Sequence, residues 1–202
     1  MTSMGAAAST TSAVSAACGA PAALPAGAQL ATLAGGCFWC VEAPYSGLKG
    51  VFSATSGYIG GRVPHPTYEA VCSGTTGHAE AVRVAFDPAV IPYRTLLDVF
   101  FAIHDPTTPN RQGNDVGTQY RSATFTHGEE QAAAVRAKVA ELEARGVAPV
   151  TTQVARAEEH AWYPAEEYHQ CYVERNPTQG YVRAVSLPKL LKARKEFAAL
   201  FK

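Results

Sequence analysis

The sequence lacks an excess of charge of either sign, and it lacks a long apolar run. Lysine and arginine together number 17, as do aspartate and glutamate, in a chain of 202 residues. A general binder of nucleic acid or of anionic membranes needs a basic surplus, so we expect no nucleic-acid partner. No apolar run approaches the roughly 20 residues of a membrane-spanning helix, so we expect no membrane partner either.

Charge is also missing from the start of the chain, where the first charged residue is Glu42. Residues 1–27 consist mainly of Ala, Ser, Thr and Gly, without the basic and aliphatic regions of a secretory signal. Ala16–Gly19 faintly resembles a lipoprotein cleavage site, but Ser15 stands where a bulky aliphatic residue is expected. We expect residues 1–27, with Cys18, to be a flexible or processed tail without a role in the chemistry. Residues 28–202 are expected to form a single domain in a cytoplasmic protein, although the tail leaves export open.

Cysteine is scarce, and its number is odd. Five cysteines occur in a chain too long to need disulfide staples, which favours working or free thiols over a structural framework. Hydrophobic residues make up 47% and charged residues 17%, a composition typical of a folded globular domain. The length is sufficient for one domain with a proper core.

The stretch Gly35–Cys40, with the sequence GGCFWC, is the most informative part of the chain. The run 29–34 before it predicts a strand, and the residues after it can continue a helical turn. Cys37 would then lie at a helix N-terminus, where the helix dipole favours the thiolate. Positions three apart on a helix are neighbours, so Cys37 and Cys40 could close a disulfide. Three interpretations remain open: a nucleophile with a resolving partner, half of a metal site, or two buried apolar thiols.

Alternation and helical periodicity predict the remaining elements. Strands are predicted at 51–58, 78–86, 120–125 and 150–157, helices at 67–72, 92–104, 129–145 and 188–201, and short helical turns at 162–175. A long polar loop at 105–117 separates the helix at 92–104 from the strand at 120–125, and such a loop is usually functional or disordered. This order of strands and helices indicates an α/β or α+β domain of two layers.

Three polar clusters lie outside the cysteine motif, at Pro66–Glu69, Gly77–Glu80 and Gly113–Arg121. Each has an ordinary interpretation when taken alone. The tyrosines could be packing residues, Glu80 a solvent-facing strand carboxylate, and the Asn-Asp pair a turn between glycines.

Taken together with GGCFWC, the clusters resemble the A-type peptide methionine sulfoxide reductases. The resemblance spans roughly Leu30 to Tyr181. It implies an α+β fold, a two-layer sandwich with a ferredoxin-like mixed sheet elaborated by long loops. The matching segments, all in the family's order, are Gly35–Cys40, Pro66–Glu69, Thr76–Glu80, Gly113–Ser122, Tyr168–Gln170 and Asn176–Pro177.

The resemblance implies a role for each of seven residues. Cys37 is the nucleophile, Phe38 and Trp39 form an apolar wall around the substrate methyl group, and Asp115 shapes the pocket. The sulfoxide oxygen is surrounded by Glu80, Tyr68 and Tyr120. A sulfoxide oxygen leaves poorly unless it is protonated, so Glu80 must keep its proton near neutral pH, as a partly desolvated carboxyl can. Aromatic rings suit a methyl sulfide, because sulfur–aromatic contacts stabilise by about 0.3–1.5 kcal/mol.

The expected reaction is the thiol-dependent reduction of the S epimer of methionine sulfoxide, protein-bound or free, in the repair of oxidised proteins. Cys37 becomes a sulfenic acid, a second thiol condenses with it to a disulfide, and thioredoxin reduces that disulfide by exchange. We expect a monomer without a cofactor or a metal.

The resolving thiol is where the chain departs from part of the family. Many members have glycine at the position of Cys40 and resolving cysteines in a glycine-rich tail, whereas this chain ends in a basic helix without cysteine. We assign the resolving role to Cys40, with Cys171 as the alternative or as a second relay thiol. Cys72 is expected to be buried and inert.

Two other functions remain as alternatives. A general dithiol oxidoreductase of thioredoxin type would use Cys37 and Cys40 but would need neither Glu80 nor Asp115. A zinc module would use Cys37, Cys40, Cys72 and Cys171, but the second CxxC pair that zinc ribbons usually show is missing.

Overall fold

The computed structural model describes residue 19 and residues 23–202, so the expectations for Cys18 and for most of the N-terminal tail lie outside it. A six-stranded sheet in the order β7-β6-β1-β3-β2-β8 forms one layer. Only the β6–β7 pair is parallel, so the sheet is mixed, as predicted. The strands are β1 Gln29–Gly35, β2 Val51–Ile59, β3 Ala79–Phe86, β6 Ser122–Thr126, β7 Gln153–Arg156 and β8 Tyr163–Pro164.

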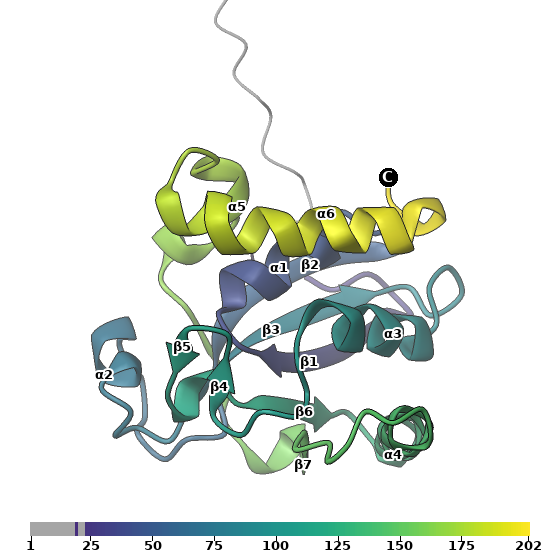
Figure 1. Ribbon diagram of the computed structural model, residues 1–202, viewed down its shortest axis with the longest axis horizontal. Helices are drawn as coiled ribbons and strands as arrows, with labels where there is room; N and C mark the ends of the chain where they lie inside the picture. Colours follow the sequence, from purple (N-terminus) through teal and green to yellow (C-terminus); the bar gives the residue numbers. More distant parts are fainter. Residues whose placement is uncertain (1–18, 20–22) are drawn as a thin grey trace, which may run out of the picture.

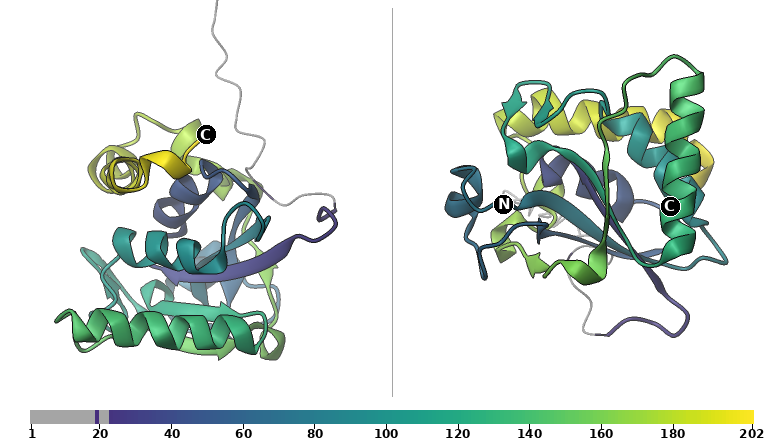
Figure 2. Two further views of the ribbon diagram at one scale, coloured as in Figure 1. Left: turned by 90° about the vertical axis from the view of Figure 1, so that its right-hand side faces the viewer. Right: turned by 90° about the horizontal axis from the view of Figure 1, so that it is seen from below.

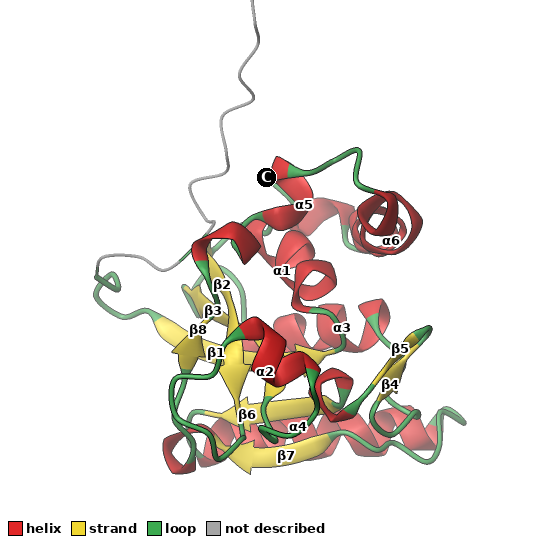
Figure 3. Cartoon of the chain, turned by 90° about the vertical axis from the view of Figure 1, so that its left-hand side faces the viewer, coloured by secondary structure: helices red, strands yellow, loops and turns green. Residues whose placement is uncertain are grey.

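Helices form the second layer on one face of this sheet (Figure 3). Helix α1 packs on β1, β2 and β3, and α6 lies across α1 on the side away from the sheet. Helix α3 contacts both α6 and α4 and lies between them (Figure 2). The helices are α1 Phe38–Ser46, α2 Tyr68–Cys72, α3 Tyr93–Ile103, α4 Glu129–Ala144, α5 Tyr172–Arg175 and α6 Leu187–Glu196.

The main core lies between the sheet and the helices and is built from alternate residues of β1 and β3. Leu33 and Val82 face each other across the two strands, and the fully buried rings of Tyr45 on α1 and Phe100 on α3 belong to the same core cluster. Each such side chain stabilises the fold by about 1.5–3 kcal/mol through burial. A smaller apolar cluster around Phe125 occupies the opposite face of the sheet, so the central strands are apolar on both faces.

The end of the molecule at which α1 begins gathers segments from distant parts of the sequence. Helix α2, the hairpin β4–β5 and α5 all lie at this end (Figure 1). The hairpin, with β4 Arg111–Gln112 and β5 Asp115–Val116, was not predicted and forms inside the expected polar loop. Its strands are only two residues long, so no alternating pattern could reveal it.

The predicted elements from β1 to α4 are present within a few residues of their expected bounds, and the C-terminal part differs more. β8 occurs where short helical turns alone were predicted. The last helix ends at Glu196 rather than Phe201 and is preceded by a π-helical segment, Val182–Ser186, which continues directly into α6. No helix among the described residues is long and apolar enough to cross a membrane.

Candidate active site

Cys37 occupies the N-cap position of α1, directly after the turn that ends β1. Gly36 has φ of 95°, and a Cβ atom there would lie 2.6 Å from the Gln112 side chain. A Cβ atom on Gly35 would lie 2.9 Å from the ring of Phe100. The two glycines are therefore needed for the chain to turn sharply between the sheet and the helix.

The carboxyl group of Glu80 lies beside this turn, because β3 runs antiparallel to β1 at the centre of the sheet. The side chain is only 1% exposed, and its Oε2 accepts a 3.0 Å hydrogen bond from the backbone N–H of Phe38. Its Oε1 has no hydrogen-bond partner among the described residues. Burial raises the pKa of Glu80 to about 8, the Phe38 N–H opposes this rise, and the negative charge of Asp115 adds to it. Glu80 is therefore mostly protonated at neutral pH.

Tyr68 and Tyr120 reach the same place from α2 and from the short 3₁₀ helix Thr118–Tyr120. Burial raises the pKa of both phenols, and the negative charge of Glu80 raises it further. Both hydroxyls therefore remain protonated and can donate hydrogen bonds. The structure thus brings the two predicted tyrosines together with Glu80.

Phe38 and Trp39 form an aromatic wall next to these groups. Phe38 is fully buried, with its ring centroid 5.0 Å from that of His169 and 6.4 Å from that of Tyr68. Trp39 stacks on Tyr172 with centroids 3.7 Å apart and donates a 3.1 Å hydrogen bond from Nε1 to Nδ1 of His169. This wall directly follows Cys37, since Phe38 and Trp39 are the first two residues of α1.

Cys37 and Cys40 both carry free thiols, and both are buried. Burial raises the pKa of Cys37 well above its ordinary value, and the charges of Cys40 and Glu80 raise it further. The expectation that the helix N-terminus would favour ionisation of Cys37 is therefore wrong, because desolvation outweighs the dipole. The hydrogen bond with Cys37 and the charge of Lys189 lower the pKa of Cys40 to about 6 against the effect of burial. The hydrogen bond with Cys37 and the charge of Lys189 thus favour a thiolate at Cys40.

Asp115 approaches the cysteines through Tyr181, a residue to which the sequence assigned no role. The Tyr181 hydroxyl donates a 2.6 Å hydrogen bond to Oδ2 of Asp115 and lies 3.7 Å from Sγ of Cys40. Sγ of Cys40 also lies 3.2 Å from Oγ of Ser186. Neither Tyr181 nor Ser186 stands in a recognisable motif for this contact, since 141 and 146 positions separate them from Cys40.

Glu166 is a second residue that the sequence analysis missed. Its Oε1 accepts a 2.9 Å hydrogen bond from the backbone N–H of Tyr68, and its Oε2 accepts one of 2.8 Å from the hydroxyl of Tyr58. The carboxylate therefore binds the start of α2 to the central sheet and holds Tyr68 in place.

Two further cysteines among the described residues, Cys72 and Cys171, are not part of the Cys37–Cys40 pair. Cys72 is exposed, so the expectation that it is buried is wrong, because its five-residue helix α2 projects from the body of the domain. Cys171 is buried and disulfide-bonded, so it is not a thiol in this state. Across the described residues, no group of three or more His, Cys, Asp or Glu side chains is placed to hold a metal ion.

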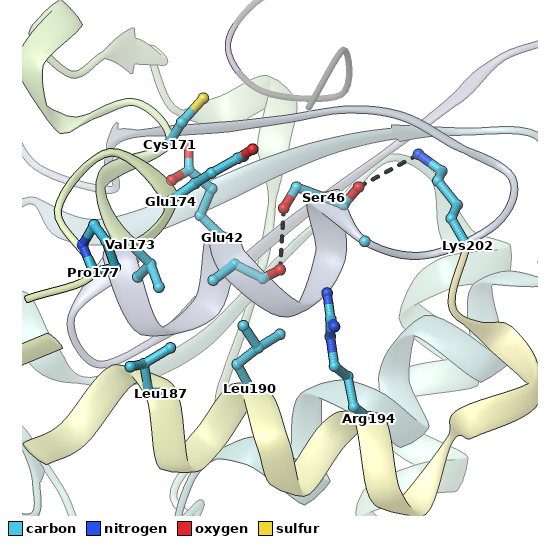
Figure 4. A pocket seen from close by; sticks show the side chains of 12 residues that line it. Glu42, Ser46, Cys171, Val173, Glu174, Pro177, Leu187, Leu190, Arg194 and Lys202 are labelled. Carbon is cyan, nitrogen blue, oxygen red and sulfur yellow. Dashed lines mark hydrogen bonds between the residues drawn. The ribbon is translucent and has the colours of Figure 1, made fainter. Parts of the chain in front are cut away.

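A cavity of about 410 Å³ lies behind α1, between that helix and α6 (Figure 4). Glu42 and Cys171 lie at one end of it, and Leu187 and Leu190 line it from α6. Neither Cys37 nor Glu80 lines this cavity, so it is separate from the site described above. Burial raises the pKa of Glu42 to about 7.

Comparison with known proteins gives matches over most of the chain. The family model described as peptide methionine sulfoxide reductase matches residues 29–200. Peptide methionine sulfoxide reductase MsrA of Polynucleobacter asymbioticus is 54% identical over 174 residues, covering 85% of this chain and 90% of that protein. A protein of the same name from Thermus thermophilus is 53% identical over 174 residues, covering 86% of this chain and 98% of that protein.

Solved structures are similar as well. The reduced form of Mxr1 from Saccharomyces cerevisiae has a TM-score of 0.70 and 37% identity, covering 77% of this chain and 89% of that one. Methionine sulfoxide reductase A of Corynebacterium diphtheriae has a TM-score of 0.70 and 34% identity, covering 77% of this chain and 78% of that one.

Proposed function

This chain belongs to the peptide methionine sulfoxide reductase family and is an enzyme that reduces methionine sulfoxide; on that premise we propose how its residues divide the reaction. Sγ of Cys37 attacks the sulfur of the sulfoxide and forms a bond between the two sulfur atoms, Glu80 gives its proton to the oxygen, and the proton of the Cys37 thiol replaces it on Glu80. Tyr68 and Tyr120 donate hydrogen bonds to that oxygen, Asp115 shapes the pocket, and the methyl group lies against Phe38 and Trp39. The hydroxyl group passes from the substrate sulfur to Sγ of Cys37, the bond between the two sulfur atoms breaks with an electron pair returning to the substrate sulfur, methionine leaves, and Cys37 is left as a sulfenic acid.

The observation that best supports these roles is that the carboxyl group of Glu80 is buried and keeps its proton at neutral pH. A carboxyl with a pKa of about 8 is a proton donor matched to neutral pH, and its Oε1 has no partner among the described residues to compete with a substrate. Neither alternative function requires such a group, since a dithiol oxidoreductase and a zinc module both act through sulfur alone.

The second half of the proposal is that Cys40 resolves the sulfenic acid. Cys40 is three positions from Cys37 on α1, its thiol is free, and its pKa of about 6 makes it a thiolate at neutral pH. Cys171, the alternative, becomes available only after its own disulfide is opened. We further propose that thioredoxin reduces the Cys37–Cys40 disulfide by thiol exchange.

A single turnover without reductant tests this assignment. The reduced enzyme is mixed with the separated S and R epimers of methionine sulfoxide, free and within a peptide, and the products are identified by mass spectrometry. We expect one methionine per enzyme from the S epimer, together with a Cys37–Cys40 disulfide. In Cys40→Ser we expect the methionine and a trapped sulfenic acid at Cys37. A Cys37–Cys171 disulfide in that variant would assign the resolving role to Cys171, and absence of methionine from the wild type would refute the reaction.

The remaining parts of the proposal concern the state of the enzyme in the cell. We propose a cytoplasmic monomer without a nucleic-acid partner. The cytoplasm keeps most thiols reduced, so we expect the disulfide of Cys171 that the structure contains to be open there, and the state of Cys171 in rapidly alkylated cells tests the location. A largely oxidised Cys171 would contradict the cytoplasmic assignment, and a mass of two chains in analytical ultracentrifugation would contradict the monomer.

A further inference from the structure

The buried thiol of Cys40 points away from solvent, toward the helical segment that precedes α6. Oγ of Ser186 lies 3.2 Å from Sγ of Cys40, and both residues are fully buried. Cys40 is the only hydrogen-bond partner of this hydroxyl among the described residues. A buried hydroxyl usually finds a partner, and here that partner is a sulfur atom that must react.

The π-helical segment Val182–Ser186 explains how two hydroxyls reach one thiol. Tyr181 and Ser186 are five positions apart, and in an α-helix such residues point about 140° away from each other. A π-helical turn bonds each residue to the one five positions along, which brings residues at this spacing onto one side. Tyr181 lies 3.7 Å and Ser186 3.2 Å from the same sulfur atom.

A positive charge also acts on this thiol, that of Lys189 in the first turn of α6. It lowers the pKa of Cys40, as do the hydroxyls of Ser186 and Tyr181. Lys189 also lines, with Asp115 and Tyr181, a cavity of about 630 Å³ that borders the active site. The segment 181–189 therefore supplies both the hydrogen bonds and the charge that stabilise a thiolate at Cys40.

We propose that Ser186 is a positioning residue for the second half of the reaction, holding Cys40 as an oriented thiolate that is ready to attack Cys37. The inference rests on the proposed role of Cys40 as the resolving thiol. Sγ of Cys40 attacks Sγ of the Cys37 sulfenic acid, the S–S bond forms, and the S–O bond breaks with its electron pair going to oxygen. The departing oxygen takes up one proton and leaves as water. Cys40 released one proton when it became a thiolate, so the step involves no net gain or loss of protons.

Ser186→Ala tests the proposal, because it removes one oxygen atom without adding bulk. In a single turnover, methionine release reports the first step, and alkylation with mass spectrometry reports the disulfide. We expect methionine release to be unchanged and disulfide formation to slow about tenfold, the loss expected for one hydrogen bond to a charged group. The pH midpoint of disulfide formation should move upward relative to the wild type, because the hydrogen bond from Ser186 favours the thiolate of Cys40.

Further variants separate the hydrogen bond from general packing. Ser186→Thr keeps the hydroxyl and should restore most of the rate. Lys189→Gln should also raise the pH midpoint, whereas Lys195→Gln, which removes the same charge from an exposed site on α6, should not. Ser53→Ala removes a buried serine hydroxyl from β2 and should leave both steps unchanged.

The results for Cys40→Ser test whether Cys40 is the resolving thiol, and the results for Ser186→Ala test whether Ser186 positions it. If Cys40→Ser still forms an intramolecular disulfide, the resolving thiol is another cysteine, whatever Ser186 does. If Cys40→Ser traps the sulfenic acid but Ser186→Ala resolves it at the wild-type rate and with the wild-type pH midpoint, the positioning role is refuted. Equal slowing of methionine release and disulfide formation in Ser186→Ala would also refute it, because the variant would then disturb the site as a whole.

Discussion

The backbone N–H of Phe38 donates a 3.0 Å hydrogen bond to Oε2 of Glu80, linking the first residue of α1 to the second residue of β3. An N–H group in the first turn of a helix has no partner within that helix, so it is available to a side chain. The bond fixes one oxygen of Glu80 and leaves the other free of partners among the described residues. The residue next to the nucleophile therefore orients the acid.

Glu80→Gln should lower the rate of methionine release at least about 100-fold, because the variant cannot give a proton to the sulfoxide oxygen. The amide can still accept the hydrogen bond from Phe38, so the fold should be retained. In the wild type the rate should fall as the pH rises through about 8, where Glu80 loses its proton. Single-turnover rates between pH 6 and 10 measure both effects. Glu69→Gln, an exposed carboxylate on α2, is the control, and the same alkaline decline in Glu80→Gln would contradict the assignment.

Tyr181→Phe and Asp115→Asn should affect methionine release non-additively, because Tyr181 donates its 2.6 Å hydrogen bond to Asp115. Tyr181→Phe removes the donor of that bond, and Asp115→Asn removes the negative charge that makes it strong, so the double variant should be little worse than the more impaired single one. The coupling should be about 1.5–3 kcal/mol, as for a hydrogen bond to a charged group. A double-mutant cycle on kcat/KM measures it, and strictly additive losses would mean that the two residues act independently.

Trp39→Phe should raise KM about fivefold while kcat changes little. The phenyl ring can still stack on Tyr172, but the hydrogen bond from Nε1 to His169 is lost, so the aromatic wall is held less firmly. Steady-state kinetics with methionine sulfoxide distinguish the two constants. Trp162→Phe is the matched control, since that indole packs on the opposite face of the sheet against Arg83. Equal KM values for Trp39→Phe and the wild type would show that the indole N–H does not matter for binding.

Glu42 should make the protein less stable as the pH rises from about 4.5 to about 7. Its pKa is about 7 in the folded protein and near 4.5 when unfolded, so the folded state retains the proton that the unfolded state loses. The free energy of unfolding should therefore fall over this interval by about 3 kcal/mol on account of Glu42.

Chemical denaturation at pH 5 and pH 8 tests this prediction by comparing the wild type with Glu42→Gln. The variant should lose less stability between the two pH values, because its amide does not titrate. The contribution of Glu80 has the same sign but is present in both proteins, so it cancels in the comparison. Glu159→Gln, an exposed carboxylate, should behave as the wild type. An identical pH dependence in Glu42→Gln and the wild type would mean that Glu42 ionises normally when folded.

Long elements with a regular pattern were predictable, and short ones were not. The alternation in 78–86 and the Ala- and Glu-rich stretch 129–145 correspond to β3 and α4 almost residue for residue. The strands of the hairpin β4–β5, which pair with each other, and β8, which pairs with the distant β2, have two residues each and are too short for a local pattern to mark them. The π-helical segment 182–186 likewise has an ordinary helical composition.

The sequence by itself determined the chemical groups of this enzyme, because GGCFWC and the segments around Tyr68, Glu80 and Asp115 can be recognised without coordinates. Only the tertiary structure decided the protonation states and the partners of those groups. Burial keeps the proton on Glu80 and on Cys37, and contacts across more than 140 positions bring Ser186 and Tyr181 to Cys40. Desolvation and long-range packing depend on what surrounds a side chain in space, and local sequence patterns do not contain that information.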